Sequence, residues 1–164
     1  MSKIRVSGLI GESIVDGPGF RYAIFAQGCT HHCEGCHNPQ THDLYGGYEV
    51  EIDQILKELD SNPLLDGITL TGGEPLLQAE QLMPLVEQVK ARGLSIVVYS
   101  GFLFEEIMKN EGFVRLILKC DILIDGKFEL DKRSLDLLYR GSSNQRIIDI
   151  PKSMETGKIT LWNQ

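Results

Sequence analysis

The sequence contains no apolar stretch that approaches the length of a membrane span, and no repeat, low-complexity tract or linker interrupts it. A helix that crosses a bilayer needs about 18 or more apolar residues in a row, so the sequence predicts no membrane-spanning helix. The first ten residues also lack the apolar core of a secretory signal. We therefore expect a cytoplasmic protein.

Basic residues are fewer than acidic ones, with 16 Lys and Arg against 23 Asp and Glu and a net charge of −7. A general affinity for nucleic acid depends on positive charge that neutralises phosphates, so we expect no nucleic-acid partner. The length of 164 residues and the hydrophobic fraction of 42% suit one domain with a substantial core. We predict a single domain over residues 1–164.

Cysteine is scarce as well, and four cysteines in a reducing compartment do not indicate a disulfide framework. Three of them, Cys29, Cys33 and Cys36, lie in the stretch GCTHHCEGCHNP (residues 28–39) with the spacing C-x3-C-x2-C, whereas Cys120 lies far along the chain. Cysteines clustered in this way indicate metal or redox chemistry. These three cysteines have no fourth cysteine nearby, and the missing fourth ligand limits the kinds of metal centre that they could form.

Two common centres fit the deficit poorly. Every histidine of the chain lies in this segment or within three residues of its end, so a Cys3His zinc site has to be considered: His31, His32, His37 and His42. Zinc sites of that type usually have a second ligand pair downstream, and the sequence offers none. A ferredoxin-like electron carrier would have a fourth cysteine close by, whereas Cys120 opens an apolar stretch and is interpreted as a small buried hydrophobe.

A third reading makes use of the missing ligand. Three thiolates hold three irons of a [4Fe–4S] cluster and leave the fourth iron open, and an open metal position is a mark of catalytic rather than structural centres. The fourth ligand would then be the substrate. The residues favour this reading, and a zinc site remains the alternative.

Strand and helix patterns alternate along the chain. Apolar residues recur with helical spacing from Ile52 to Leu59 and from Leu82 to Val89, and Gly93 ends the second of these helices. Further helices are expected over 103–119 and around 131–139. Strands are expected at 21–28, 66–73, 94–101 and 120–126, with short ones near 145–150 and 158–162.

Repeated βα units with almost continuously apolar strands predict an α/β fold with a mostly parallel sheet covered by helices. A closed eight-unit barrel typically needs about 250 residues, so a partial (β/α) barrel of the TIM type is expected. The polar, glycine-rich stretches GCTHHCEGC, TGGEP, YSG and DGKF stand where predicted strands end. The carboxyl ends of parallel strands carry the site in such folds, so these stretches should converge on one cleft.

The C-x3-C-x2-C loop resembles that of the radical S-adenosylmethionine enzymes, and TGGEP (residues 71–75) is similar to their second motif. The resemblance implies that Cys29, Cys33 and Cys36 hold a [4Fe–4S] cluster whose open iron chelates S-adenosylmethionine. Electron transfer would cleave this cosubstrate to methionine and a 5′-deoxyadenosyl radical. Gly72 and Gly73 would let backbone approach the methionine end, and Glu74 would accept hydrogen bonds from the iron-bound amine.

Three further stretches narrow the resemblance to the activating proteins of anaerobic ribonucleotide reductase: VDGPGFRYAIFAQGC (15–29), CEGCHN (33–38) and YRGSSNQRIID (139–149). Members of this branch are oxidoreductases that install a glycyl radical on the large subunit of the reductase. The resemblance places Gly35, Cys36 and His37 against the adenosyl part of the cosubstrate. It also implies a reduced flavodoxin-like protein as electron donor.

The stretch DGKF (125–128) resembles a strand-end motif of related glycyl-radical activases. There a lysine meets the carboxylate of the cosubstrate and an aspartate helps to bind a monovalent cation, which implies these roles for Lys127 and Asp125. Two alternatives stay open: an activase of another glycyl-radical enzyme, and a zinc-stabilised binding module without catalysis. No chemistry is assigned to DGPG (16–19).

Overall fold

The computed structural model describes residues 2–31, 33–36 and 39–162. Its strands, in chain order, are β1 (Lys3–Ser13), β2 (Arg21–Ala26), β3 (Tyr48–Glu51), β4 (Gly67–Gly72), β5 (Ser95–Ser100), β6 (Ile122–Asp125) and β7 (Arg146–Asp149). They form one sheet in the order β3-β1-β2-β4-β5-β6-β7.

The strand directions agree with the prediction of a mostly parallel sheet. β2, β4, β5 and β6 are parallel neighbours, whereas β1 and β7 run antiparallel to the strands beside them. β3 pairs antiparallel with β1 and so points the same way as β2. β3 and β7 stand at opposite edges of the sheet, so the barrel is open, and the prediction of a partial (β/α) fold is confirmed.

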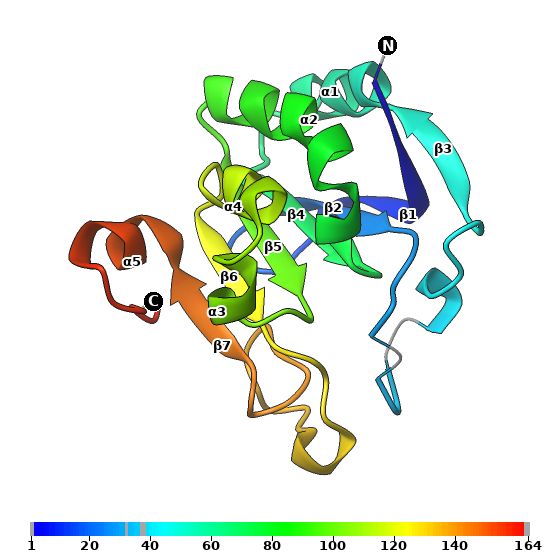
Figure 1. The fold of residues 1–164 in the computed structure, drawn as a ribbon. Coiled ribbons are helices and arrows are strands. Elements are labelled where there is room, and N and C mark those ends of the chain that lie inside the picture. The colour runs from blue at the N-terminus through cyan, green and yellow to red at the C-terminus, as the bar shows by residue number, and fades with distance from the viewer. Residues whose placement is uncertain (1, 32, 37–38, 163–164) are drawn as a thin grey trace.

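The α-helices are α1 (Ile52–Asp60), α2 (Ala79–Ala91), α3 (Phe104–Ile107), α4 (Glu111–Ile117) and α5 (Ile150–Thr156). Three short 3-10 helices accompany them: η1 (Pro39–Thr41), η2 (Pro75–Gln78) and η3 (Leu130–Lys132). Figure 1 shows α1, α2 and α4 on one face of the sheet, where α2 contacts both of the others. Within the described ranges, no helix is long and apolar enough to cross a membrane.

The main core lies between the sheet and these helices. The residues that repeat with helical spacing in α1 and α2 are all buried there: Ile52, Ile55, Leu56, Leu59, Leu82, Leu85, Val86 and Val89. Strand β5 contributes Ile96 and Val98 to this core, while Val97 and Tyr99 point to the opposite face. The period-2 alternation of strand side chains therefore gives the sheet two packed faces.

Two predicted helices differ in the structure. The helix expected over 103–119 is divided into α3 and α4, because the side chain of Asn110 accepts a hydrogen bond from Phe113 N and caps a new helix. The helix expected around 131–139 is wrong. That segment contains η3 and then a loop in which Leu135 is 92% exposed. Most of a helix's stability comes from packing its apolar face against a core, and the leucines of this segment lack such a surface.

The strands expected at the end of the chain are confirmed only in part. The first is β7, while the segment 158–162 makes an isolated bridge between Leu161 and Ile148. The sequence patterns also gave no indication of β1 and β3, which extend the sheet beyond β2.

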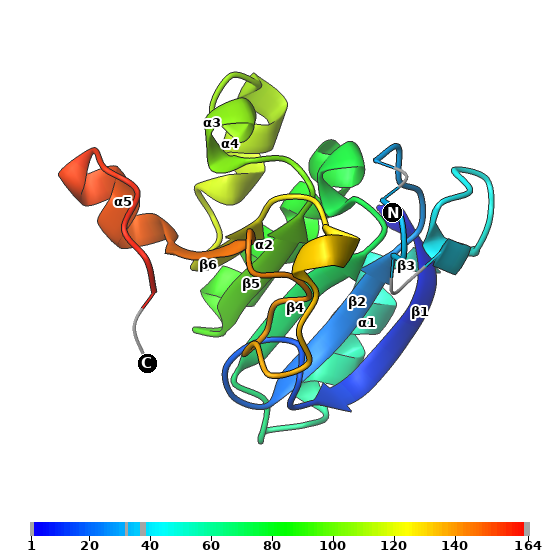
Figure 2. The ribbon, with the colours of Figure 1, turned by 90° about the horizontal axis from the view of Figure 1, so that it is seen from below.

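The second face of the sheet is covered by loops instead of helices. Figure 2 shows the loop that follows β1 and the loop that precedes β7 lying over this face. Gly17, in the DGPG stretch, lies so close to the Val97 side chain that a Cβ on it would be 3.2 Å from a methyl group. The Tyr99 hydroxyl donates a hydrogen bond to the carbonyl of Tyr139. Both loops are thus anchored to β5.

Arg21, at the start of β2, fixes the first of these loops. Its side chain is 1% exposed, and its guanidinium donates hydrogen bonds to the carbonyl of Pro18, to Thr69 and Ile68 of β4, and to Ser95 of β5. Burial lowers the pKa of Arg21 to about 10. Only a planar fork with five donors can serve so many acceptors at once.

We predict that Arg21→Lys lowers the free energy of unfolding by about 2–4 kcal/mol, because an ammonium leaves several buried acceptors unpaired. Thermal or denaturant unfolding of the metal-free protein measures this. Arg115→Lys, on the exposed side of α4, is the matched control and should change stability by less than about 0.5 kcal/mol. Equal stability of the two variants would contradict the role given to Arg21.

Candidate functional site

The carboxyl ends of the four parallel strands meet at one cavity of about 620 Å³. This volume is within the usual range for a small-molecule site. The cavity is lined by residues from every strand end that the sequence singled out, together with the loop before β7: Cys29, His31, Cys33, Cys36, Thr71, Gly72, Gly73, Tyr99, Ser100, Gly101, Gly126, Lys127, Phe128, Tyr139, Arg140 and Gln145. The prediction that these stretches converge is confirmed by the geometry.

The cysteine loop begins directly after β2 and is closed at its base by two backbone hydrogen bonds. Gly28 N donates to Thr41 O at 2.6 Å, and Cys29 N donates to His42 O at 3.2 Å. Within the loop, Cys36 N donates to Cys33 O at 3.2 Å, so these two cysteines share a tight turn. Cys29 is buried, Cys33 and Cys36 are half-buried, and none of the three is part of a disulfide. All three thiols therefore border the cavity.

The electrostatic surroundings of Cys33 come partly from the loop that follows β6. Burial raises the pKa of the Cys33 thiol above its ordinary value. The backbone N–H of Phe128, which hydrogen-bonds this thiol, and the ammonium of Lys127 act in the opposite direction. Both groups favour a thiolate, which is the form that binds metal.

The three thiols around the cavity suit an iron–sulfur cluster. Among the described residues, no three His, Cys, Asp or Glu side chains lie close enough together to hold one metal ion. A cluster makes a different demand, because each thiolate binds its own iron, and three thiols around one cavity meet that demand. The remaining space, bordered by glycines, a lysine and aromatic rings, fits a cosubstrate beside the cluster.

Gly73 is held where two backbones nearly touch. A Cβ built on it would be 2.4 Å from Gly28 O and 2.9 Å from Thr41 O, and Glu74 N donates a hydrogen bond to Gly28 O at 2.8 Å. This glycine therefore brings the end of β4 against the base of the cysteine loop. Gly72 also lines the cavity, with a φ of +91°. Their approach to the methionine end of a cosubstrate stays a prediction.

The Glu74 side chain connects several segments around the cavity. It is fully buried outside the cavity lining, and its carboxylate accepts hydrogen bonds from four donors: His31 Nε2 (2.6 Å), Ser100 Oγ (3.0 Å), Gly101 N (2.8 Å) and Leu76 N (3.2 Å). The carboxylate thus joins the cysteine loop to the ends of β4 and β5. A hydrogen bond from an iron-bound amine to Glu74 stays a prediction.

Asp125 likewise has internal partners in the structure. It is fully buried, forms two hydrogen bonds with the Arg146 guanidinium, and accepts a third from Phe104 N at 2.8 Å. Asp125 thus forms an ion pair between β6 and β7, and its contact with a cation or cosubstrate stays a prediction. Lys127, two residues further on, does line the cavity.

The remaining predicted contacts lie in the cysteine loop. Gly35 faces the loop after β6, where a Cβ on it would be 2.7 Å from the Leu130 side chain and 3.4 Å from Phe128. His37 falls outside the described residues. Cys120 is fully buried in the main core, its thiol donates to Leu116 O at 3.4 Å, and burial raises its pKa. This agrees with its reading as a buried hydrophobe.

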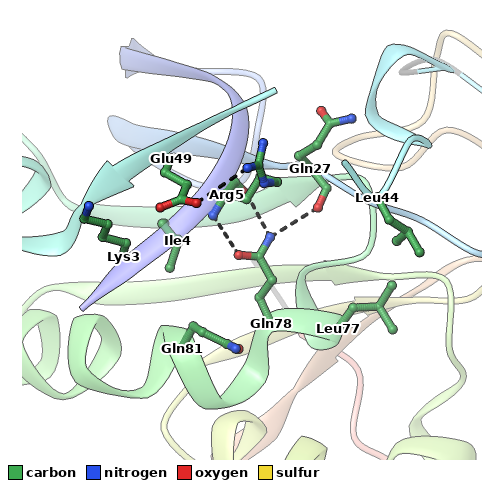
Figure 3. A pocket seen from close by; sticks show the side chains of 9 residues that line it. All are labelled: Lys3, Ile4, Arg5, Gln27, Leu44, Glu49, Leu77, Gln78 and Gln81. Carbon is green, nitrogen blue, oxygen red and sulfur yellow. Dashed lines mark hydrogen bonds and ion pairs between the residues drawn. The ribbon is translucent and has the colours of Figure 1, made fainter. Parts of the chain in front are cut away.

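Gln78, at the end of η2, adds a further connection outside the cavity. Its amide donates to Arg5 O at 2.8 Å and to Gln27 O at 3.2 Å, while its oxygen accepts from Arg5 N at 2.8 Å (Figure 3). Gln27 immediately precedes the cysteine loop. The segment after TGGEP is therefore fixed to both β1 and the start of that loop.

Sequence reasoning missed His31 as a site residue except as a possible zinc ligand. Its ring packs edge-on against Phe102, with centroids 4.6 Å apart, and it bonds Glu74. Tyr99 and Arg140 were also not singled out, although both line the cavity. The position of His31 between two clustered cysteines was the only available signal, and it could not reveal a partner forty-three residues away.

Comparisons with known proteins agree with this geometry. A family model described as a 4Fe-4S single cluster domain matches residues 15–148. The anaerobic ribonucleoside-triphosphate reductase-activating protein of Escherichia coli (strain K12) is 36% identical over 140 residues, covering 80% of this chain and 90% of that protein. Its counterpart in Enterobacteria phage T4 is 39% identical over 140 residues, covering 81% and 86%.

A third relative is the pyruvate formate-lyase-activating enzyme of Clostridium pasteurianum, 36% identical over 124 residues, which make up 70% of this chain and 52% of that enzyme. The matches first define a class, that of proteins with a single [4Fe–4S] cluster domain. Within it, the chain belongs to the family of the anaerobic ribonucleoside-triphosphate reductase-activating proteins, which are radical S-adenosylmethionine enzymes. The predicted family, the [4Fe–4S] cluster and S-adenosylmethionine as cosubstrate are confirmed.

We predict that Cys29→Ala, Cys33→Ala and Cys36→Ala each prevent stable assembly of the cluster, because each thiolate is assigned to one iron. Iron and sulfide analysis together with absorption spectra after anaerobic reconstitution measure this. Cys120→Ala, which removes a thiol from the core at a cost of about 1 kcal/mol, should keep full cluster content. Loss of the cluster in the Cys120 variant would refute the three-ligand assignment.

We further predict that Gly73→Ala reduces both thermal stability and cluster content, because its methyl group would displace Gly28 and with it Cys29. Overpacking of this kind typically costs about 1–3 kcal/mol. Gly11→Ala is the control, since no heavy atom lies within 4 Å of a Cβ at that position. If Gly73→Ala assembles a normal cluster and melts like the parent protein, the close backbone contact is not needed.

Proposed function

We propose that the protein activates an anaerobic ribonucleoside-triphosphate reductase by generating a glycyl radical on it. The observation that carries this proposal is the meeting of three thiols with the ends of β4, β5 and β6 around one cavity, in a chain related over about four fifths of its length to activating proteins of that reductase.

The cofactor chemistry and the protein's contribution are separate. A bound [4Fe–4S] cluster with S-adenosylmethionine supplies a one-electron cleavage to methionine and a 5′-deoxyadenosyl radical, which takes a hydrogen atom from a glycine Cα and becomes 5′-deoxyadenosine. In this proposal Cys29, Cys33 and Cys36 hold the irons. The Lys127 ammonium pairs with the cosubstrate carboxylate, and the backbone at Gly73 lies beside its methionine end.

The open sheet suits a protein substrate. The glycine has to enter the cavity, and its own polypeptide then covers the opening and excludes water from the radical. Val15 and Leu135, at the opening, are 70% and 92% exposed, and such exposed apolar side chains favour contact with another protein. The large subunit of the reductase is the partner in this reading, and a reduced flavodoxin-like protein is the electron donor. The proposed location is the cytoplasm.

A second candidate function has support from one observation. The similarity to a pyruvate formate-lyase-activating enzyme favours another glycyl-radical enzyme as the substrate of the same chemistry. The two candidates share every step up to hydrogen abstraction and differ only in the protein that enters the cavity.

We predict that the reconstituted protein, mixed without oxygen with anaerobic ribonucleotide reductase, reductant and S-adenosylmethionine, produces a glycyl radical. A doublet in the electron paramagnetic resonance spectrum, together with ribonucleotide reduction, measures this. Cys33→Ala should abolish the signal, and Cys120→Ala should retain it. A signal that develops on pyruvate formate-lyase but never on the reductase would support the second candidate and reject the first.

A further inference from the structure

The segment Arg140–Gln145, with the sequence RGSSNQ, folds back on itself through the side chain of its last residue. Gln145 Oε1 accepts hydrogen bonds from the backbone of Gly141 (2.9 Å) and Ser142 (3.1 Å). Arg140 Nη1 donates to Gln145 O at 3.0 Å. The segment is therefore a closed turn of fixed shape, located just before β7.

Side chains of this turn bind the loop that follows β6 at three backbone positions. Gln145 Nε2 donates to Gly126 O at 3.0 Å, Asn144 Nδ2 donates to Lys127 O at 2.8 Å, and Ser142 Oγ accepts from Glu129 N at 3.2 Å. The ladder between β6 and β7 ends at the pair Asp125–Arg146. Beyond the end of the backbone ladder, side chains of the turn thus hydrogen-bond the backbone of three further residues, Gly126, Lys127 and Glu129.

The loop that is held in this way forms the wall of the cavity next to the cysteines. Lys127 and Phe128 line the cavity, and the backbone N–H of Phe128 hydrogen-bonds the Cys33 thiol. On the other side of the cysteine turn, Phe128 and Leu130 lie against Gly35. A shift of the loop would therefore move both a cavity cation and a hydrogen-bond donor to a cluster cysteine.

We propose that RGSSNQ is a positioning element for the cluster end of the cavity, an inference that rests on the proposed function. It holds the backbone of residues 126–129 so that the Phe128 N–H reaches Cys33 and the Lys127 side chain stays in the cavity. Hydrogen bonds to cysteine sulfur stabilise the more negatively charged, reduced state of an iron–sulfur cluster and so raise its potential. Arg140, Gly141 and Gln145 of the turn line the cavity, whereas Ser142 and Asn144, whose side chains hold the loop after β6, are not part of its lining.

Adjacent serines provide the first test, in the metal-free protein. Ser142→Ala removes the acceptor of the Glu129 N–H, so hydrogen exchange at that amide should become about five to ten times faster, as expected for one lost hydrogen bond. Ser143→Ala makes the same chemical change at an exposed side chain for which the described residues provide no hydrogen bond, and should leave exchange unchanged. Equal exchange in the two variants would overturn the contact.

The second test uses the reconstituted protein without any reductase. Asn144→Ala frees the carbonyl of Lys127, so the midpoint potential of the cluster should become more negative and the KM for S-adenosylmethionine should rise about tenfold, with iron content unchanged. Ser142→Ala should show both effects more weakly, and Ser143→Ala neither. If Asn144→Ala fails to fold, Ser142→Ala takes its place in this test.

A purely structural turn would lower the melting temperature in these variants while potential and KM stayed at the parent values, and that result would reject the proposal. Because cosubstrate cleavage is measured without a partner protein, it is independent of which glycyl-radical enzyme is activated. Failure of the glycyl-radical experiment would therefore leave this result intact.

Discussion

The arrangement of the site depends on one buried carboxylate. Glu74 has no exposed surface, and a charge in such a place is tolerated only when several donors surround it. Its donors come from the cysteine loop, the end of β5 and the start of η2. Three segments that are distant in sequence are thereby held at one point, and the positions of the thiols relative to the strand ends follow from it.

The two faces of the sheet are covered in different ways. Helices bury the larger apolar face, whereas the opposite face carries a smaller core around Val97, Ile122 and Ile124. Loops close this second face, anchored by Arg21 and by the Tyr99–Tyr139 hydrogen bond. Loops change shape at lower cost than packed helices, so this face is the more adaptable of the two.

Much of the fold could be predicted from the sequence, because helical and strand periodicities report directly on which side chains are buried. The cysteines and the strand-end glycines could also be found in the sequence, because the spacing that marks them is local. The internal partners of Glu74 and Asp125 could not be predicted, because an acidic residue in a motif looks the same whether it faces a ligand or donors from distant parts of the chain. The loop at 131–139 was misjudged because leucine spacing predicts a helix only where a surface exists to cover it.

The closed base of the cysteine loop affects whether the protein stays folded after oxygen has damaged its cluster. Its hydrogen bonds, from Gly28 to Thr41 and from Cys29 to His42, involve backbone alone, and the main core lies on the other side of the sheet. Zinc fingers, by contrast, unfold when their metal leaves. Here we expect the protein to stay folded when its cluster is lost. A damaged cluster could then be rebuilt on the folded chain, so that the cell replaces iron and sulfide instead of the polypeptide.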